Sequence, residues 1–462
     1  MDKDNKDVID VTKKYDAGLN RIDIFGLYYG IKNTVQLTLY DNNNNKCYQQ
    51  NISVPTDTLE LPNINVKAKN EIYTAKYDKM SPGWIIYSNE GSTIFDLKGN
   101  LRGYFNHDKL KLGTPVKFFD EHFEILGWSY LFRKIDMVGN ILYELDFHNL
   151  TNTTDQYDIH HEFMEIPAGK YKGNYMFLAS KKGTPYVEDY IIIVDMENKA
   201  LVKEMDMKKI MPTDTRFVSV SIPANDWLHQ NSLEYDSRDD SIIFSARHQG
   251  VVKIRMPENN GQLTWEGGDS IVWFLTPHKG ITESQMPNVS SKLLYPLDKD
   301  GQPITDQLVL DGYERHQDFE WNYMQHSAIL LENGNLIIYD NGDGRFFKTT
   351  DELLALDLLY SRYVEYKIDE SNMTVQQIYE YGKEEGANLF SRIMSNVGVL
   401  GNNILFMFSA WQYTNTYSTY VEWEKDSKDV IYQIRSYFNG QTYRAYKINY
   451  FDYMNMDYKN IE

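Results

Sequence analysis

Cysteine is almost absent from this sequence of 462 residues, which contains only Cys47. A single cysteine cannot form a disulfide within the chain, so a disulfide-stabilised scaffold is excluded. No run of eighteen apolar residues occurs, and the sequence therefore predicts no membrane span. Basic residues are also scarce, because 47 lysines and arginines stand against 66 acidic residues and give a formal charge of −19. Nucleic acid is not expected as a partner, since binding phosphates requires clustered basic residues.

Several motifs of enzymes that use nucleotides or a serine nucleophile are also missing. The sequence contains no Walker phosphate loop, no G-x-G-x-x-G and no G-x-S-x-G. We therefore expect no cofactor, and a nucleotide sulfate donor has no visible binding motif. The opening residues, MDKDNKDVIDVTKKYD, lack the apolar segment of a signal peptide. By itself this start fits both a cytoplasmic protein and the mature form of an exported one.

Tyrosine is unusually abundant, with 36 residues against 21 phenylalanines and 8 tryptophans. Tyrosine favours half-buried strands, so its excess indicates β structure. From about residue 80 a pattern recurs in which an apolar strand, a polar turn with Gly or Asn and a second strand follow one another. Clear copies are STIFDLKGNLRGYF around Asp96, RKIDMVGNILYELDF around Asp136 and IIIVDMENKALVKEMDM around Asp195. Six imperfect hairpins of this kind predict a six-bladed β-propeller.

Residues 1–75 have a different texture from the remainder of the chain. Alternating apolar residues in IDIFGLYYG (22–30) and NTVQLTLYD (33–41) predict a small N-terminal β-sandwich. The predicted fold is thus all-β, with a sandwich domain over residues 1–75 and the propeller over residues 76–462. A long insertion is expected near residues 276–318. Helix is sparse, and the clearest short helix is TTDELLALDLL (349–359), with Thr349 or Thr350 as its cap.

Histidines precede comparable strands in three of the repeats. His160 and His161 lie in DIHHEFMEIP, His229 lies in NDWLHQNSLEYD, and His326 lies in NYMQHSAILL. Because propeller blades are related by rotation, these side chains are expected to point towards one axis. Arg345 follows a Gly-rich turn after the His326 strand. We predict a site for an anionic group built from His229, His326 and Arg345, since Arg offers paired donors to sulfate or phosphate oxygens and His exchanges protons near neutral pH.

Four residues are weaker candidates for contacts with the ligand at this site: Asn341, His248, His160 and His161. An alternative is that each histidine merely bonds to nearby backbone at a blade edge. The histidines could also hold zinc, but no carboxylate or cysteine stands at a short ligand spacing beside them, so no metal is predicted. Asp340-Asn341-Gly342-Asp343-Gly344 lacks the carboxylate pattern of a calcium loop, and a tight turn is favoured.

Four long stretches resemble a known family. They are DWLHQNSLEYDSRDDSIIFSARHQGVVKI (226–254), QHSAILLENGNLIIYDNGDGR (325–345), YSRYVEYKIDESNMTVQQIYEYGKE (360–384) and IFGLYYGIKNTVQLTLYD (24–41). They are similar to the bacterial aryl-sulfate sulfotransferases, which do not use a nucleotide sulfate. The resemblance implies a six-bladed propeller after an N-terminal sandwich, a homodimer and export. It also implies transfer of a sulfuryl group from a small phenolic sulfate to a phenol acceptor through a sulfohistidine.

Carried over residue by residue, the resemblance gives His229 and His326 the task of binding or protonating the transferring group. It gives Arg345 the task of holding its oxygens. The family's nucleophilic histidine is expected downstream of YEYGKE, but no histidine follows His326 in this chain. The aligned position falls at Trp411 or Gln412. Trp411 and the neighbouring Tyr413 are weaker site candidates, Tyr413 as a nucleophile or as a trapped sulfate acceptor.

Three hypotheses about function stay open at this point. The first is a sulfotransferase with altered chemistry, which either transfers directly between two bound phenols or recruits another histidine of the channel. The second is a catalytically silent propeller that binds aryl sulfates or other aromatic anions. The third is an interaction scaffold in which the site residues are relics.

Overall fold

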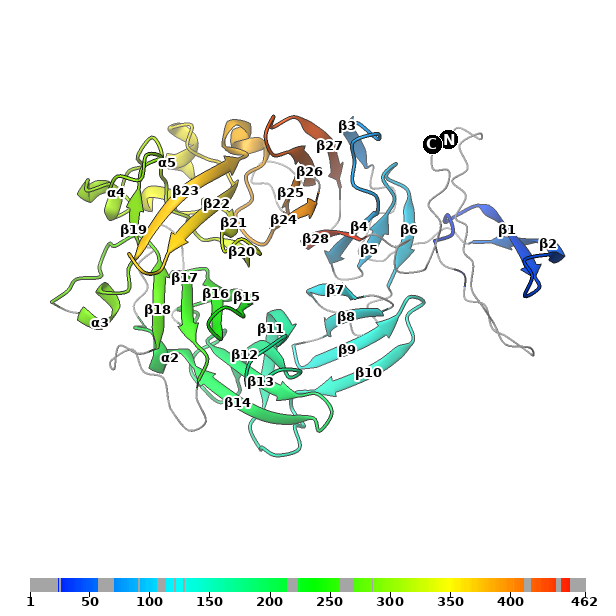
Figure 1. Ribbon diagram of the computed structural model, residues 1–462, viewed down its shortest axis with the longest axis horizontal. Helices are drawn as coiled ribbons and strands as arrows, with labels where there is room; N and C mark the ends of the chain where they lie inside the picture. The colour runs from blue at the N-terminus through cyan, green and yellow to red at the C-terminus, as the bar shows by residue number, and fades with distance from the viewer. Residues whose placement is uncertain are drawn as a thin grey trace.

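The computed structural model describes residues 24, 26–56, 70–89, 92–105, 114–119, 122–127, 129–213, 223, 225–257, 270–284, 286–401, 403–410, 417–437 and 442–448. Within these ranges six sheets of four or five strands are arranged in a ring, and a separate hairpin lies to one side (Figure 1). The sheets are the blades of a β-propeller, which confirms the predicted fold class.

The six blades are numbered here in the order in which the chain enters them. Blade 1 contains β4 (Trp84–Asn89), β5 (Thr93–Phe95), β6 (Leu101–Tyr104) and β28 (Thr442–Ile448). Blade 2 contains β7 (Val116–Phe119), β8 (His122–Gly127), β9 (Leu131–Asp136) and β10 (Ile141–Asp146). Blade 3 contains β11 (Tyr157–Glu165), β12 (Tyr175–Lys181), β13 (Tyr190–Asp195) and β14 (Ala200–Asp206).

The second half of the ring is built in the same way. Blade 4 contains β15 (Gln230–Asp236), β16 (Ser241–Ala246), β17 (Gly250–Arg255) and β18 (Ile271–Leu275). Blade 5 contains β19 (Tyr295–Leu297), β20 (His326–Leu330), β21 (Leu336–Asp340), β22 (Arg362–Asp369) and β23 (Thr374–Tyr381). Blade 6 contains β24 (Asn396–Gly401), β25 (Ile404–Ser409), β26 (Ser418–Glu424), β27 (Val430–Ser436) and β3 (Glu71–Ala75).

The helices of the described residues are all short. They are α2 (Met207–Ile210), α3 (Pro287–Ser290), α4 (Gln307–Leu310), α5 (Thr350–Ala355) and the 3-10 helices η1 (Arg345–Phe347) and η2 (Lys383–Asn388). The predicted insertion near 276–318 holds α3, β19 and α4. Thr349 caps α5 in a capping box with Glu352, as the sequence predicted. None of these helices is long and apolar enough to cross a membrane.

Strand periodicity explains why the middle strands are apolar throughout. Side chains along a strand alternate between its two faces, and each blade has a neighbour on both faces. In β13, Ile191 and Ile193 pack in the core shared with blade 4, whereas Ile192 and Val194 pack in the core shared with blade 2. The continuous run YIIIVD therefore buries both faces of one strand, and such runs hold the ring together.

The recurrent Asp turn has a direct structural cause. Asp96 Oδ1 accepts hydrogen bonds from the backbone N–H groups of Lys98 and Asn100 at 3.0 and 2.8 Å. Gly99 has a φ of +79°, which glycine adopts without steric cost. The same bonds recur at Asp136, where Val138 and Asn140 donate at 3.0 and 2.8 Å. The repeat seen in the sequence is thus the hairpin turn between the outer strands of a blade.

Both ends of the propeller sequence close the ring. β28 pairs antiparallel with β4 as the innermost strand of blade 1, and β3 pairs with β27 as the outermost strand of blade 6. β3 lies within residues 1–75, which the sequence analysis assigned to the N-terminal domain. Each closing blade therefore combines strands from opposite ends of the chain, and hydrogen-bonded strand pairs join the two ends of the ring.

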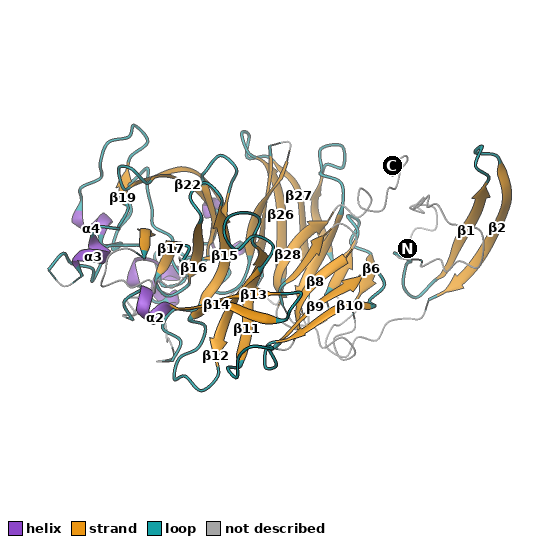
Figure 2. Ribbon diagram, turned by 60° about the horizontal axis from the view of Figure 1, so that its bottom comes forward, coloured by secondary structure: helices purple, strands orange, loops and turns teal. Residues whose placement is uncertain are grey.

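The hairpin of β1 (Lys32–Tyr40) and β2 (Lys46–Pro55) lies apart from the ring (Figure 2). It is an antiparallel pair in which Val35 faces Ile52. A sandwich needs a second sheet, and the described part of residues 1–75 shows only this hairpin and β3. The N-terminal sandwich accordingly stays a prediction.

Candidate functional site

A cavity of about 470 Å³ lies where the innermost strands converge. These strands are β7, β11, β15, β20, β24 and β28, and β11 contacts β15, β15 contacts β20, β20 contacts β24, and β24 contacts β28. All six blades line the cavity, from Tyr443 in blade 1 and Gly127 in blade 2 to Met394 at the start of blade 6. A ligand at this position would be held by the whole ring.

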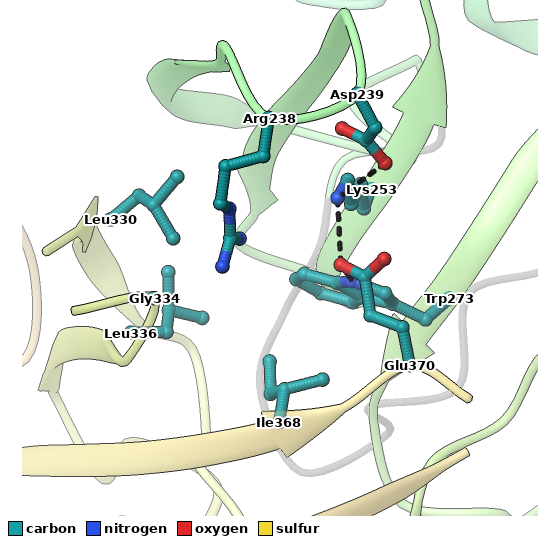
Figure 3. A pocket seen from close by; sticks show the side chains of 9 residues that line it. All are labelled: Arg238, Asp239, Lys253, Trp273, Leu330, Gly334, Leu336, Ile368 and Glu370. Carbon is teal, nitrogen blue, oxygen red and sulfur yellow. Dashed lines mark hydrogen bonds and ion pairs between the residues drawn. The ribbon is translucent and has the colours of Figure 1, made fainter. Parts of the chain in front are cut away.

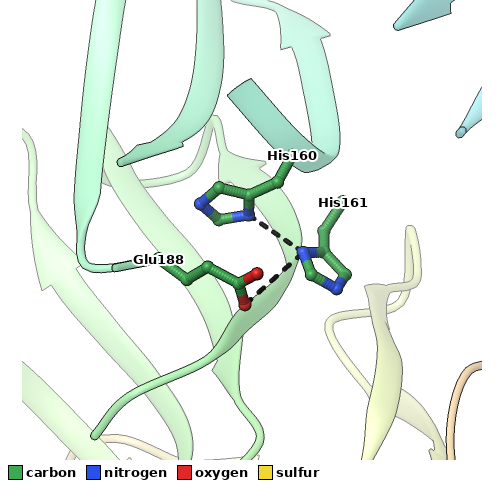
Figure 4. A group of neighbouring side chains, drawn as sticks. All are labelled: His160, His161 and Glu188. Atoms are coloured by element: carbon green, nitrogen blue, oxygen red, sulfur yellow. Dashed lines mark hydrogen bonds and ion pairs between the residues drawn. The ribbon is translucent and has the colours of Figure 1, made fainter. Parts of the chain in front are cut away.

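His160 and His161 both reach this cavity although they are neighbours on one strand. Side chains of adjacent strand residues ordinarily point to opposite faces. In β11 the register shifts between His160 and Phe163, and His161 has a φ of +53°. This bulge turns both rings to the cavity, with the two Nδ1 atoms 2.9 Å apart (Figure 4). Burial lowers the pKa of His160 and holds that of His161 well below its usual range.

His229 lies between two carboxylates. Its Nδ1 is 2.8 Å from Asp226 Oδ2 and 2.9 Å from Glu188 Oε2, so one N–H faces both groups. Burial alone would lower the pKa of His229, but Glu188 and Asp226 outweigh it and raise the pKa to about 9. Burial would likewise raise the pKa of Glu188, yet His161, His229 and His160 hold it well below its usual range.

Arg247 brings a guanidinium to the cavity wall. His248 Nδ1–H donates to the carbonyl oxygen of Asp226 at 2.7 Å, which leaves its Nε2 to accept from Arg247 Nη1 at 3.1 Å. Burial, and then Arg247, lower the pKa of His248 to about 3, so the ring stays neutral as this arrangement requires. Arg247 Nη2 also lies 3.5 Å from Asp343 Oδ2. His248 therefore acts on the site by positioning Arg247.

His326 enters the cavity at the first residue of β20. Its Nδ1–H donates to Asn341 Oδ1 at 2.8 Å, and its Nε2 accepts the Met394 N–H at 3.2 Å. Asn341 Nδ2 donates to the carbonyl oxygens of Ser391 and Met394, which fixes the orientation of the amide. Burial holds the pKa of His326 well below its usual range. The structure thus presents His326 as a neutral imidazole whose tautomer is set by Asn341.

Arg345 does not lie with His229 and His326, contrary to the predicted convergence. It is fully buried beside Asp340 and Glu320, and its Nη2 donates to Asp340 Oδ2 at 3.1 Å and to the Tyr360 carbonyl oxygen at 3.0 Å. The turn at Gly342 explains why Arg345 points into blade 5. The Arg345 guanidinium packs directly against Gly342, and a Cβ at that residue would collide with it. The turn folds Arg345 back onto its own blade, and Arg247 supplies the guanidinium of the cavity instead.

The other candidates divide into two groups. His160 and His161 line the cavity, and the His248 ring lies 5.2 Å from that of His229. Asn341 lies behind His326. Trp411, Gln412 and Tyr413 lie outside the described residues. Sequence reasoning missed Glu188, Asp226 and Arg247 as site residues. The three-residue spacing of Asp226 and His229 and the Arg247-His248 pair were available signals, but no local pattern marks Glu188.

Two sets of possible metal-ligand atoms occur at this cavity in the described residues. His160, His161 and Glu188 form one set, and Asp226, His229 and His248 form the other, each within 4.8 Å. In the second set both nitrogens of His248 are already engaged, by the Asp226 carbonyl and by Arg247. In the first set the two Nδ1 atoms face each other, Glu188 Oε2 also faces His229 Nδ1, and all three residues line the cavity.

A second hollow of about 190 Å³ lies between blades 4 and 5 (Figure 3). The buried Lys253 ammonium lies 2.8 Å from both Asp236 and Asp239 and 2.6 Å from Glu370. Glu370 also accepts a hydrogen bond from Trp273 Nε1 at 2.9 Å. These three carboxylates are near enough to one another to hold a metal ion, but Lys253 already occupies the place of the cation. We assign this hollow to inter-blade structure.

Comparison with known proteins adds a family to this geometry. Residues 69–447 match the family described as arylsulfotransferase (ASST). An arylsulfate sulfotransferase AssT from Escherichia coli O6:H1 is 46% identical over 174 residues, which cover 37% of this chain and 26% of that protein. The protein of the same name from Lelliottia amnigena is 38% identical over 169 residues, covering 37% and 25%. The matched stretch thus spans about a quarter of each relative.

Two solved structures are also similar at low sequence identity. A Bacteroides caccae protein of unknown function has a TM-score of 0.40 at 10% identity and covers 79% of this chain and 98% of that one. The β-propeller domain of Myceliophteria thermophila Cps50 (Swd1) has a TM-score of 0.36 at 9% identity and covers 79% and 89%. At these TM-scores the strand pairing, rather than either likeness, establishes the fold.

Proposed function

Because this chain belongs to the arylsulfotransferase family, we propose that it transfers a sulfuryl group from a phenolic sulfate ester to a phenol in the central cavity. One observation carries the proposal. The cavity brings the Arg247 guanidinium and the imidazoles of His229 and His326 together from two blades. Such a set can bind the oxygens of a sulfate ester and exchange a proton with its phenolic oxygen.

Each side chain has a distinct task in this proposal. Arg247 holds the non-bridging oxygens and offsets the charge that develops on them in the transition state. His229, fixed through Nδ1 by Asp226 and Glu188, uses its other ring nitrogen towards the ligand. When the sulfur–oxygen bond to the donor breaks, the electron pair stays on the phenolic oxygen, which takes up the proton of His229 Nε2, and the acceptor phenol returns its own proton to that nitrogen. His326, held in orientation by Asn341, forms another part of the wall.

Two routes of transfer are compatible with the residues of the cavity. In the first, the acceptor phenol attacks the sulfur directly while the donor phenolate leaves. In the second, a neutral imidazole of the cavity forms a nitrogen–sulfur bond and later passes the sulfuryl group to the acceptor. His326 is the neutral ring with a fixed tautomer, and its Nε2 lone pair is able to attack once the hydrogen bond from the Met394 N–H is broken. Initial rates separate the routes, because parallel double-reciprocal lines indicate the covalent route and intersecting lines indicate direct transfer.

A second candidate function is binding of aryl sulfates without turnover. It is favoured by the absence of histidine after His326, where the family resemblance expects the nucleophile. Both functions use the same cavity, so binding alone does not distinguish them.

The experiment is nitrophenol release from 4-nitrophenyl sulfate, followed by absorbance with and without an added phenol, beside calorimetric titration of the ester. Acceptor-dependent release supports transfer. Binding without release supports the silent function. If the ester neither binds nor reacts, both proposals fail and an interaction scaffold is favoured. Arg247→Met is the site variant, and Arg255→Met, at an exposed residue of β17, is its matched control.

A further inference from the structure

His160, His161 and Glu188 place three metal-ligand atoms around one point on the cavity wall (Figure 4). The two Nδ1 atoms are 2.9 Å apart, and His161 Nδ1 is 3.7 Å from Glu188 Oε2. Zinc bonds of about 2.0–2.1 Å in a tetrahedron put ligand atoms about 3.3–3.4 Å apart. The two separations lie on either side of that value, so an ion fits between the three atoms with small rotations of the side chains.

The same group has more acceptor atoms than protons. Two Nδ1 atoms that face each other at 2.9 Å share at most one proton between them. The Glu188 carboxylate has only lone pairs to offer, and the N–H of His229 near it is shared with Asp226. Without a metal ion, one Nδ1–H donates to the other Nδ1, and Glu188 Oε2 faces the N–H of His229. A metal ion would displace the proton between the two rings and accept a lone pair from each of the three ligand atoms.

Backbone conformation at two of the three residues is unusual. His161 and Glu188 have φ values of +53° and +56°, in the left-handed region that non-glycine residues seldom adopt. Such backbone strain persists where the surrounding structure enforces it, and it concentrates at functional sites. In β11 it has the specific effect of aiming two adjacent imidazoles at the same point as Glu188.

The donor set selects the class of metal. Two imidazoles and one carboxylate with an open position occur in zinc sites that act on a ligand, and the same donors hold Fe(II) in non-haem iron sites. Calcium and magnesium prefer oxygen ligands throughout. His160, His161 and Glu188 all line the cavity of about 470 Å³, so the fourth position faces the space where a ligand would lie.

We propose that His160 Nδ1, His161 Nδ1 and Glu188 bind a zinc ion whose open position coordinates an oxygen of an anionic ligand in the cavity. This site stands independently of the proposed sulfuryl transfer, since it rests on the three ligand atoms and the cavity alone. The sequence predicted no metal because Glu188 is far from the histidines along the chain. The loop before β13 brings it to them.

The test is metal binding by protein that has been treated with a chelator and dialysed. Titration with Zn²⁺ is expected to give one tight equivalent, and Co²⁺ is expected to give the visible absorption of a tetrahedral site. Glu188→Gln, which is nearly isosteric, and His161→Asn are each expected to weaken Zn²⁺ binding at least about tenfold. His148→Ala is the matched control, because His148 forms another histidine–carboxylate pair, with Asp158 at 3.0 Å, away from the cavity-lining residues.

Each outcome decides the proposal. Absence of a stoichiometric equivalent overturns it, as does equal binding by the wild type and both site variants, which would mark adventitious metal. Circular dichroism of each variant verifies folding, and Glu188→Gln decides the test if His161→Asn does not fold. Adding inorganic sulfate to the Co²⁺ form is expected to change its spectrum, and an unchanged spectrum would overturn the open position. No aryl sulfate enters these measurements, so their failure is distinct from failure of the proposed transfer.

Discussion

This propeller contains two buried groups of charged residues, and they differ in whether their charged atoms pair only with protein groups or also face a cavity. The blade 5 ion-pair network consists of Glu320, Asp340, Arg345, Arg362 and Glu380. Arg362 Nε lies 2.8 Å from Asp340 Oδ2, and its Nη1 lies 2.7 Å from Glu380 Oε2. Its Nη2 donates to the carbonyl oxygens of Glu320 and Trp321 at 2.9 and 3.1 Å. The network lies within blade 5 and links β21, β22 and β23 with the segment before β20.

The cavity histidine cluster consists of His160, His161, Glu188, Asp226 and His229. It draws on β11 and on the loops before β13 and β15, and all of its members except Asp226 line the cavity. Two Nδ1 atoms face each other, and two carboxylates share one N–H. Burial and charge are common to both groups, so neither property identifies a site. A site is identified instead by whether the charged atoms pair only with other protein groups or also face a cavity.

Arg362→Met should cause the largest loss of stability, because Arg362 holds the blade 5 ion-pair network together. It leaves Asp340 buried without its main cation, which typically costs about 3–5 kcal/mol of unfolding free energy. Urea denaturation measures the loss. Lys367→Met, at an exposed residue of the same strand, is the control and should change stability by less than about 0.5 kcal/mol. A loss below about 1 kcal/mol for Arg362→Met would mean that the network does not support the blade.

Arg247→Met and Arg345→Met should separate the two groups by function. Arg247→Met loses charge-assisted hydrogen bonds to the ligand that are worth about 1.5–3 kcal/mol. The variant should therefore bind the aryl sulfate about 10–100-fold more weakly than the wild type, with little change in stability. Arg345→Met should instead lower stability while the folded protein binds normally. Calorimetry of the ester and urea denaturation measure the two effects. Normal stability with lost binding in Arg345→Met would restore the assignment made from the sequence.

Lys253→Met should give a smaller loss of stability than Arg362→Met, although Lys253 also pairs with three carboxylates. Side chains of Asp239 and Glu370 are 37% and 36% exposed, so water solvates them when the ammonium is removed, and the buried Asp236 keeps its ion pair with Arg238 at 2.6 Å. We expect a loss of about 1–2 kcal/mol by urea denaturation, since partly exposed pairs contribute little. A loss equal to that of Arg362→Met would show that solvent exposure does not explain the difference.

The last effect depends on pH and is expected from Glu234, a half-buried carboxyl near Lys117 and Glu162. Burial raises its pKa from 4.5 to about 8, with Lys117 opposing and Glu162 adding to the shift. Because the folded state holds this proton more tightly, the stability that it contributes is present below pH 4.5 and is lost as pH rises to about 8. Glu234→Gln should remove this part of the pH dependence. Identical denaturation profiles of variant and wild type between pH 5 and 8 would contradict the shift.

Much of the fold was predictable because it depends on local pattern. The Asp turns around Asp96 and Asp136, the apolar run of β13 and the cap at Thr349 each follow from neighbouring residues. The family resemblance is confirmed over residues 69–447. Ring closure by β3 and β28 was not predictable in this way, since each strand pairs with one from the opposite end of the chain.

The sequence by itself determined a six-bladed propeller of the arylsulfotransferase family with histidines at the start of its inner strands. Rotation of similar blades about one axis made it predictable that His229 and His326 would face one channel. Tertiary structure alone decided that Arg247 and not Arg345 lines the cavity, and that Glu188 joins His160 and His161. The reason is physical. These outcomes depend on the turn at Gly342, the bulge in β11 and the loop before β13, and each takes effect through contacts with residues distant in the chain, such as Arg345 with Glu320 and His160 with Glu188.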